Sequence, residues 1–176
     1  IASGGSAFNN LVLDDGGNTI TFSLTDALSV GSTLTITNGT MSQSTSNVSS
    51  ATTLIGAGGD WSNQSTGDIE IGTGGLTNNG VIDFRSEGTC GGNDEIVITA
   101  ASGTPDWSGT GSFTMYDINL NDQNATISID LWDSSGSGYT GSWTFNSGCP
   151  SVGPTNVQLL RHGDWFDSGV EQPFTY

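Results

Sequence analysis

Residues Gly111–Phe145 read GSFTMYDINLNDQNATISIDLWDSSGSGYTGSWTF, and this stretch decides how the chain folds. Three runs within it alternate apolar and polar residues: Ser112–Tyr116, Ala125–Trp132 and Ser142–Phe145. A period of two is typical of a β-strand with one buried face, and no run has the helical period. The second run therefore has a predicted inward set, which is Ile127, Ile129 and Leu131.

Short strands of the same kind recur along the rest of the chain. Val81–Arg85 and Glu95–Ala100 alternate clearly, and the simplest register of the second run buries Ile96 and Ile98. The segments rich in Ser, Thr, Asn, Asp and Gly are expected to be loops or turns. These segments are residues 40–52, 72–79, 101–111, 119–124 and 133–141.

Two all-β architectures fit this pattern: a parallel β-helix, or β-solenoid, and an antiparallel β-sandwich of jelly-roll or immunoglobulin type. Self-similar phrases favour the solenoid. They are FNNLVLDDGGNTITF, LSVGSTLTITNGTM and GGDWSNQSTGDIEIGTGGLTNNGVIDF. Each phrase repeats a short strand, a Gly/Asn turn and another short strand, with a period of roughly 20–25 residues that lies in the solenoid range.

The length and composition indicate a single domain with a thin core. The chain has 176 residues, of which 33% are hydrophobic, and that share is low for a globular protein. We assign residues 1–156 to one all-β domain of short strands. We expect residues 157–176 to be a separate aromatic C-terminal strand or tail, which we interpret as a segment for assembly.

The net charge of −16 restricts the partners of this protein. The chain has 18 Asp and Glu residues against 2 basic residues, Arg85 and Arg161, and it has no Lys. Binding to nucleic acid needs cations that neutralise phosphates, so a nucleic-acid partner is excluded. Contact with an anionic membrane surface is disfavoured for the same reason, and no apolar run is long enough for membrane insertion.

The two cysteines, Cys90 and Cys149, both lie in Gly-rich turn contexts. We predict that they form a disulfide, which indicates an oxidising, extracellular or cell-surface location. The chain opens on Ile1 and contains no signal-peptide run. We interpret it as a mature chain from which a signal or leader was removed, with an excised piece of a longer protein as the alternative.

The phrases quoted above resemble the degenerate coils of bacterial secreted β-helix surface proteins and adhesins. The resemblance covers roughly residues 6–150 and rests on turn chemistry, not on reactive groups. It implies an extracellular, repetitive β-solenoid without enzyme activity. The C-terminal sequence LLRHGDWFDSGVEQPFTY departs from the coil pattern.

Polysaccharide-cleaving β-helices combine clustered Asp residues with a His-Gly pair and a basic clamp, so we tested the chain for these features. Asp14-Asp15 and His162-Gly163 lie far apart in sequence, and the absence of Lys removes the usual base of the lyases. No residue is therefore assigned a catalytic role, and Asp14-Asp15 is expected to be a polar turn. No cofactor is required.

Bound Ca²⁺ and glycans are open alternatives at the surface. Calcium prefers oxygen ligands, and loops rich in Asp and Asn supply them, although none here has EF-hand spacing. The candidate calcium ligands are Asp122, Asp130 and Asp133. The candidate N-glycosylation sites are Asn38, Asn47, Asn63 and Asn124.

The expected function follows from the architecture, because a solenoid exposes unpaired strands at both ends. We expect a non-enzymatic structural subunit whose partners are copies of itself, assembling by end-to-end or terminal-strand contacts into a surface filament or layer. The residues expected to connect the copies are Phe8, Leu11, Leu13, Val157, Leu159, Trp165, Phe166, Phe174 and Tyr176. The alternative is a carbohydrate-binding or adhesive module that uses exposed Trp residues, although Trp is more often buried in a thin core.

Overall fold

The computed structural model describes residues 1–17, 20–88, 90–92 and 94–150. This part of the chain forms a 14-stranded sheet and contains no α-helix. The strands are β1 (Leu11–Leu13), β2 (Thr21–Ser23), β3 (Leu28–Ser42), β4 (Val48–Asn63), β5 (Ile69–Ile71), β6 (Leu76–Asn78), β7 (Val81–Arg85), β8 (Ile96–Ala100), β9 (Asp106–Ser108), β10 (Ser112–Tyr116), β11 (Ile118–Asn121), β12 (Asn124–Trp132), β13 (Ser135–Ser137) and β14 (Thr140–Asn146).

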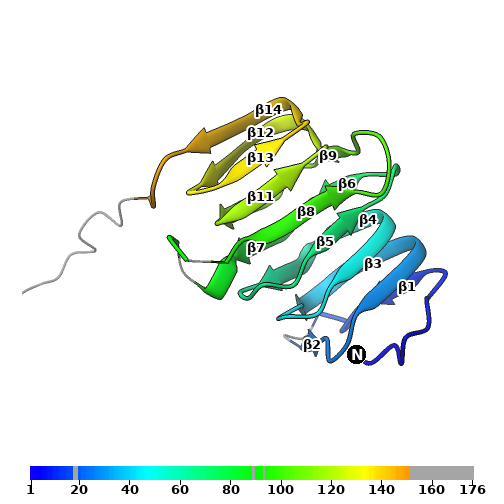
Figure 1. Cartoon of the computed structure of the whole chain (residues 1–176). Coiled ribbons are helices and arrows are strands. Elements are labelled where there is room, and N and C mark those ends of the chain that lie inside the picture. Colours follow the sequence, from blue (N-terminus) through cyan, green and yellow to red (C-terminus); the bar gives the residue numbers. More distant parts are fainter. Residues whose placement is uncertain (18–19, 89, 93, 151–176) are drawn as a thin grey trace, which may run out of the picture.

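The strands stack into a β-solenoid of about six turns, with β1 and β2 at one end and β13 and β14 at the other (Figure 1). Every strand pairing in the described residues is parallel. The predicted solenoid is thereby confirmed, and the antiparallel sandwich is excluded. Neighbouring rungs of a sheet lie about 4.8 Å apart, so the stack is about 30 Å long.

Each turn of the solenoid places strand residues on three faces. The β9 face carries β1, β6 and β9, and the β7 face carries β2, β7 and β10. The β8 face carries β5, β8, β11 and β13. The long strands β3 and β4 bend around the corners and contribute to all three faces, while β12 and β14 run across the β9 and β7 faces.

Equivalent positions recur at nearly the predicted period. On the β9 face, register links a column of inward residues in successive turns, namely Leu11, Leu34, Thr53, Leu76 and Trp107. The one long interval, from Leu76 to Trp107, contains the loop that carries Cys90. An insertion between two strands enlarges a corner of the coil without disturbing the stacking of the rungs.

The β7 face contributes the bulkiest inward column. Register places Phe22, Met41, Trp61, Ile82 and Phe113 in one line. The residues between them on this face alternate outward, and most of these are Ser or Thr. The ring of Trp61 meets that of Phe84 edge to face at a centroid distance of 5.2 Å. The tryptophans therefore build the core, which is the commoner use in a thin interior.

Two buried glutamines satisfy the indole N–H groups of this core. Trp61 Nε1 donates to Gln43 Oε1 at 2.9 Å, and Trp107 Nε1 donates to Gln123 Oε1 at 2.8 Å. Gln43 also donates to the carbonyl oxygens of Gly67 and Asp68 at 3.0 Å. Both glutamines are fully buried at corners of the coil, where a polar side chain replaces the backbone partners that bending removes.

Several strand predictions hold and others are wrong. Ile96 and Ile98 are buried as predicted, and so are Ile129 and Leu131. Ile127 is also on the inward side and packs against the core, but it is only partly buried; it lies where the pairing of β12 with β14 shifts register, between Ala125 and Ile129. The segments expected to be loops or turns contain strand residues of β3, β4, β6, β9, β11, β12, β13 and β14.

Candidate functional site

The first turn of the solenoid has an open strand edge. Strands β1 and β2 each pair with β3 on one side and have no strand partner on the other side within the described residues. Val12 is 60% exposed and Ile20 is 49% exposed, while Leu11 and Phe22 are only partly buried against the core. This end therefore presents apolar side chains together with unpaired backbone groups.

The N-terminal segment covers one face of this end but leaves the other two open. The amide of Phe8 donates to the Ser29 carbonyl at 2.9 Å, and Gly31 donates back to the Phe8 carbonyl at 2.7 Å. Asp26 accepts the amides of Ser3 and Gly4 at 2.8 and 2.7 Å. The Ser3 amide is the main reason why the pKa of Asp26 is lowered.

The last turn has a second open edge. In the described part of the chain β13 pairs only with β11, and β14 pairs only with β12. Tyr139 is 41% exposed, and its ring lies 4.7 Å from that of Phe145. Trp143 is buried in the core of this turn, and its ring lies 5.4 Å from that of Trp107. Aromatic side chains thus lie at the last turn, and its backbone edge has no strand partner among the described residues.

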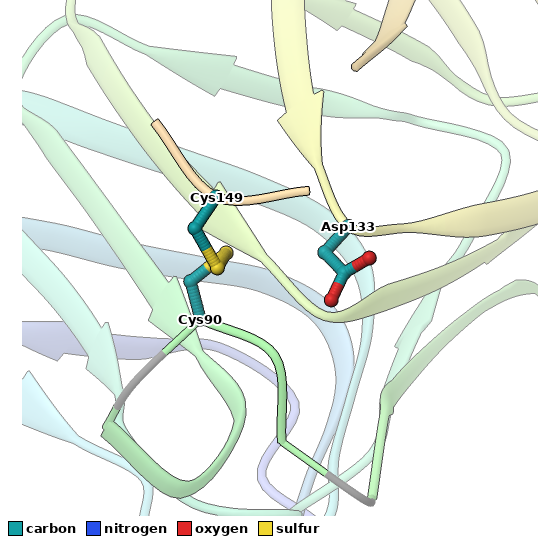
Figure 2. Close-up of side chains that lie close together, drawn as sticks. All are labelled: Cys90, Asp133 and Cys149. Atoms are coloured by element: carbon teal, nitrogen blue, oxygen red, sulfur yellow. A yellow bond between two sulfur atoms is a disulfide. The ribbon is translucent and has the colours of Figure 1, made fainter. Parts of the chain in front are cut away.

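The predicted disulfide is confirmed, and its position directs the path of the chain beyond the last strand. Cys149 bonds to Cys90 in the loop between β7 and β8, with a Cα–Cα distance of 5.5 Å (Figure 2). Strand β7 lies several rungs before β14 in the stack. Residues 147–149 therefore lead from the end of β14 to the Cys90 loop at the side of the solenoid.

An acidic corner lies next to this disulfide. Asp117 is buried and accepts the Gly91 amide with both carboxylate oxygens, at 2.9 and 3.0 Å. Burial is the main reason why the pKa of Asp117 is raised, and the charges of Asp133 and Glu95 add to the effect. The corner thus holds the Cys90 loop against β11 through backbone hydrogen bonds as well as through the disulfide.

This corner is not suited to a metal ion. Cys90, Cys149 and Asp133 place potential ligand atoms within 4.8 Å of one another. The two sulfurs are bonded to each other, however, and a disulfide lacks the thiolates that bind metals. A lone carboxylate remains, which is too few ligands for a stable site.

The structure does not bring the three predicted calcium ligands together. Asp122 lies at the turn between β11 and β12, Asp130 lies on β12, and Asp133 lies at the corner after β12. Asp122 and Asp133 both have positive φ, at 55° and 47°. That geometry is a turn role, which short polar side chains tolerate better than most residues.

The four predicted glycosylation sites differ in access. Asn47 is exposed, whereas Asn38 and Asn124 use their side-chain amides to donate to Asp14 and Asp106 at 2.8 and 2.6 Å. Asn63 is fully buried, and its amide donates to the Gly67 carbonyl at 2.7 Å. Asn63 is therefore wrong as a glycosylation site in the folded protein.

The predicted connecting residues are placed only in part. Leu13 lies in the core, and Phe8 and Leu11 pack against it at the first turn. The more exposed apolar residues of that turn, Val12 and Ile20, are the ones that sequence reasoning missed. The remaining connecting residues lie outside the described residues, namely Val157, Leu159, Trp165, Phe166, Phe174 and Tyr176.

Of the residues tested for catalysis, only Asp14 and Asp15 lie in the described part of the chain. Asp14 lies in the turn after β1, as predicted, and its carboxylate accepts the Gly16 amide at 3.0 Å. The side-chain amide of Asn38 and this Gly16 contact together lower the pKa of Asp14. His162, with which Asp14-Asp15 was compared, lies outside the described residues.

Comparisons with known proteins identify no relative. No family model, no curated protein and no solved structure matches the chain. Among the described residues, no helix is long and apolar enough to cross a membrane. The disulfide is compatible with an extracellular location.

Proposed function

We propose that this protein is a non-enzymatic, extracellular structural subunit that stacks end to end with copies of itself to form a filament or layer. The observation that carries this proposal is that, among the described residues, the strand edges at the two opposite ends of one parallel sheet have no partner, at β1 and β2 and at β13 and β14. A strand edge is a template for pairing with another chain. The last turn of one copy would then pair with the first turn of the next.

The two ends are complementary on the β7 face. The inward column of this face begins with Phe22 and ends with Trp143, so stacking would bring two aromatic side chains into contact. The outward positions beside them are Thr21 and Ser23 at one end and Ser142 and Thr144 at the other. These uncharged residues reduce the repulsion that a net charge of −16 imposes on assembly.

The polarity of the sheet determines the kind of assembly. A parallel sheet continues only if opposite ends meet, since joining two like ends would place the strands antiparallel. Contacts between two different surfaces of one subunit are heterologous, and they give open filaments when they do not close into a ring. Filaments are therefore expected in preference to closed dimers.

The direct test adds charge to the ends and compares it with charge on the flanks. Val12→Glu and Tyr139→Glu place a carboxylate at each open end. Leu54→Glu and Val81→Glu are matched controls, because both residues are 40% exposed but lie within the stack. We expect the end variants to sediment as monomers and the flank variants to assemble like the unmodified protein.

Two results would count against end-to-end stacking. Loss of assembly in the flank variants alone would show that the copies associate side by side. A monomeric unmodified protein at physiological salt, with and without Ca²⁺, would remove self-assembly altogether.

Carbohydrate binding is the second candidate function, and the structure changes where it could occur. Trp61, Trp107 and Trp143 are buried in the core and cannot form a sugar-stacking platform. Trp132 is half-buried on β12. Trp165 lies outside the described residues. Within the described part of the chain, a carbohydrate ligand would need a surface other than these buried tryptophans.

A further inference from the structure

A shallow groove runs along the β8 face near the N-terminal end of the solenoid. It has a volume of about 400 Å³ and crosses β3, β4, β5 and β8. Two columns of outward side chains form its floor. One column is Ala27, Asn47, Asp68 and Val97, and the other is Ser29, Ser49, Glu70 and Thr99.

The polar side chains of this groove differ from the hydrogen-bonded side-chain ladders found at other places on the surface. Elsewhere, outward side chains bond to one another across the rungs, as Asn124 does with Asp106 at 2.6 Å, Thr140 with Asn124 at 2.9 Å and Ser137 with Asn121 at 2.8 Å. Such ladders satisfy the hydrogen-bonding groups of these side chains and leave few of them for a ligand.

In the groove the side chains bond only to backbone groups or to none. Asn47 Oδ1 accepts the Asp68 amide at 3.0 Å, and Asp68 Oδ1 accepts the Val97 amide at 3.2 Å. These two contacts orient both side chains and leave Asn47 Nδ2 and Asp68 Oδ2 without a hydrogen-bond partner in the described part of the chain. The carboxylate of Glu70 and the hydroxyls of Ser29, Ser49 and Thr99 are likewise unengaged there.

We propose that this groove, which we call the β8-face groove, binds a neutral linear polysaccharide lying along the solenoid axis. The groove is elongated over four rungs, so a linear ligand fits it. Its spacing of about 4.8 Å per rung is comparable to the length of one pyranose ring with its glycosidic bond. Each successive sugar unit would then contact one residue of each of the two side-chain columns.

The chemistry of the lining favours a polyol over other ligands. Carboxylates accept hydrogen bonds from sugar hydroxyls, and hydrogen bonds to an ionised group are the stronger ones. The Asn47 amide and the Ser and Thr hydroxyls supply donors, while Ala27 and Val97 offer small apolar contacts to ring C–H groups. Asp68 and Glu70 would repel an acidic polysaccharide, and the protein's charge of −16 adds to that repulsion.

The test is calorimetric titration of the full chain with defined hexasaccharides. The neutral probes are cellohexaose, mannohexaose and xylohexaose, the anionic probe is hexagalacturonate, and the cationic probe is chitosan hexamer. We expect at least one neutral probe to bind and hexagalacturonate not to bind. Variants then locate the binding site.

Ser49→Tyr fills the middle of the groove without removing a hydrogen bond, and we expect it to weaken binding by about tenfold or more. Ser62→Tyr is the matched control, because Ser62 is also a half-buried outward serine of β4 but lies on the β7 face. Glu70→Gln keeps the shape of the side chain and is expected to weaken binding about five- to tenfold, since it removes a charge-assisted acceptor. Glu70→Gln also tests the proposal if Ser49→Tyr does not fold.

Three results would overturn the proposal: no binding of any neutral probe, neutral binding that neither Ser49→Tyr nor Glu70→Gln weakens, or binding of the chitosan hexamer alone. The last result would mean attraction by the carboxylates without recognition of a sugar. Val12→Glu should bind the neutral probe like the unmodified protein. The outcome for the groove is therefore independent of the outcome for end-to-end assembly.

Discussion

Gly109 shows how closely the chain approaches itself at a corner of the coil. Its φ is +111°, and a Cβ there would lie 1.9 Å from the Asn78 carbonyl oxygen. Gly16 also has a positive φ, of +70°, but a Cβ there would have no neighbour within 4 Å. We expect Gly109→Ala to lower the free energy of unfolding by about 3 kcal/mol or more and Gly16→Ala by about 1 kcal/mol. Urea unfolding measures both free energies of unfolding, and equal losses would contradict the explanation by a steric clash at Gly109.

The carboxylate of Asp60 has few hydrogen bonds to compensate for its burial. Its Oδ1 is buried with no hydrogen-bond partner among the described residues, and only Thr40 donates to its Oδ2, at 3.3 Å. Burial, followed by the nearby charge of Asp83, raises the pKa of Asp60. Because the pKa is higher in the folded state than in the unfolded state, the ionised carboxylate destabilises the fold at neutral pH and protonation relieves the cost.

Asp60→Asn should therefore raise the thermal midpoint at pH 7, by an amount corresponding to less than about 1 kcal/mol for a partly exposed group. The gain should shrink as the pH falls through the pKa of Asp60, because the carboxyl then becomes neutral in the unmodified protein. Asp130→Asn, on the same face but exposed, controls for the loss of one negative charge. If the thermal midpoint rose equally in both variants, or rose independently of pH, the charge of Asp60 would not be the cause of the destabilisation.

Alternation predicts single residues well where the strand is regular. Ile129 and Leu131 are buried as predicted, and Ile127 packs against the core but is only partly buried. It lies at a register shift between β12 and β14, and such a shift has no signal in this sequence. Asn63 could have been identified as buried, because it lies two residues after the inward Trp61 and the side-chain period is two. A glycosylation motif carries no information about the direction of its side chain.

Strand boundaries were harder to predict than strand existence. Residues 40–52 are rich in Ser, Thr and Asn and were expected to be a loop, yet most of them belong to β3 and β4. In a solenoid each inner strand pairs on both sides, and this pairing overrides weak intrinsic preference. Polar outward residues therefore hide strands that only a few inward residues, such as Met41 and Val48, indicate.

The disulfide should stabilise the end of the solenoid that carries β13 and β14. It closes a loop with a sequence separation of 59, for which the loop-entropy model gives about 4 kcal/mol. Because each turn of a solenoid contacts only its neighbours, reduction is expected to loosen the last turns first. Hydrogen exchange with and without a reductant should show faster exchange in β13 and β14 and unchanged protection in β3 and β4.

The Cys90→Ala/Cys149→Ala variant is the control for this experiment, since it should match the reduced protein and respond no further to reductant. Uniform loss of protection over all turns would show that the solenoid unfolds as one unit. No change at all would show that the acidic corner around Asp117 holds the Cys90 loop without the disulfide.

The solenoid as a whole could be predicted because its repeated phrases encode repeated turns. The three faces could not be assigned, since the coil lengths vary and the long interval before Trp107 breaks the period. The β8-face groove was also beyond prediction. It brings together side chains from four turns, and their outward directions depend on the register of every rung between them.

Electron microscopy of the purified protein at physiological salt tests the central claim most directly. End-to-end stacking predicts filaments whose axis is the solenoid axis, so averaged images or fibre diffraction should show a meridional spacing of about 4.8 Å from the rungs. Val12→Glu should abolish these filaments, and Leu54→Glu should preserve them. Filaments with the 4.8 Å spacing perpendicular to their axis would show side-by-side packing, and dispersed particles would show that the open ends do not join copies of this chain.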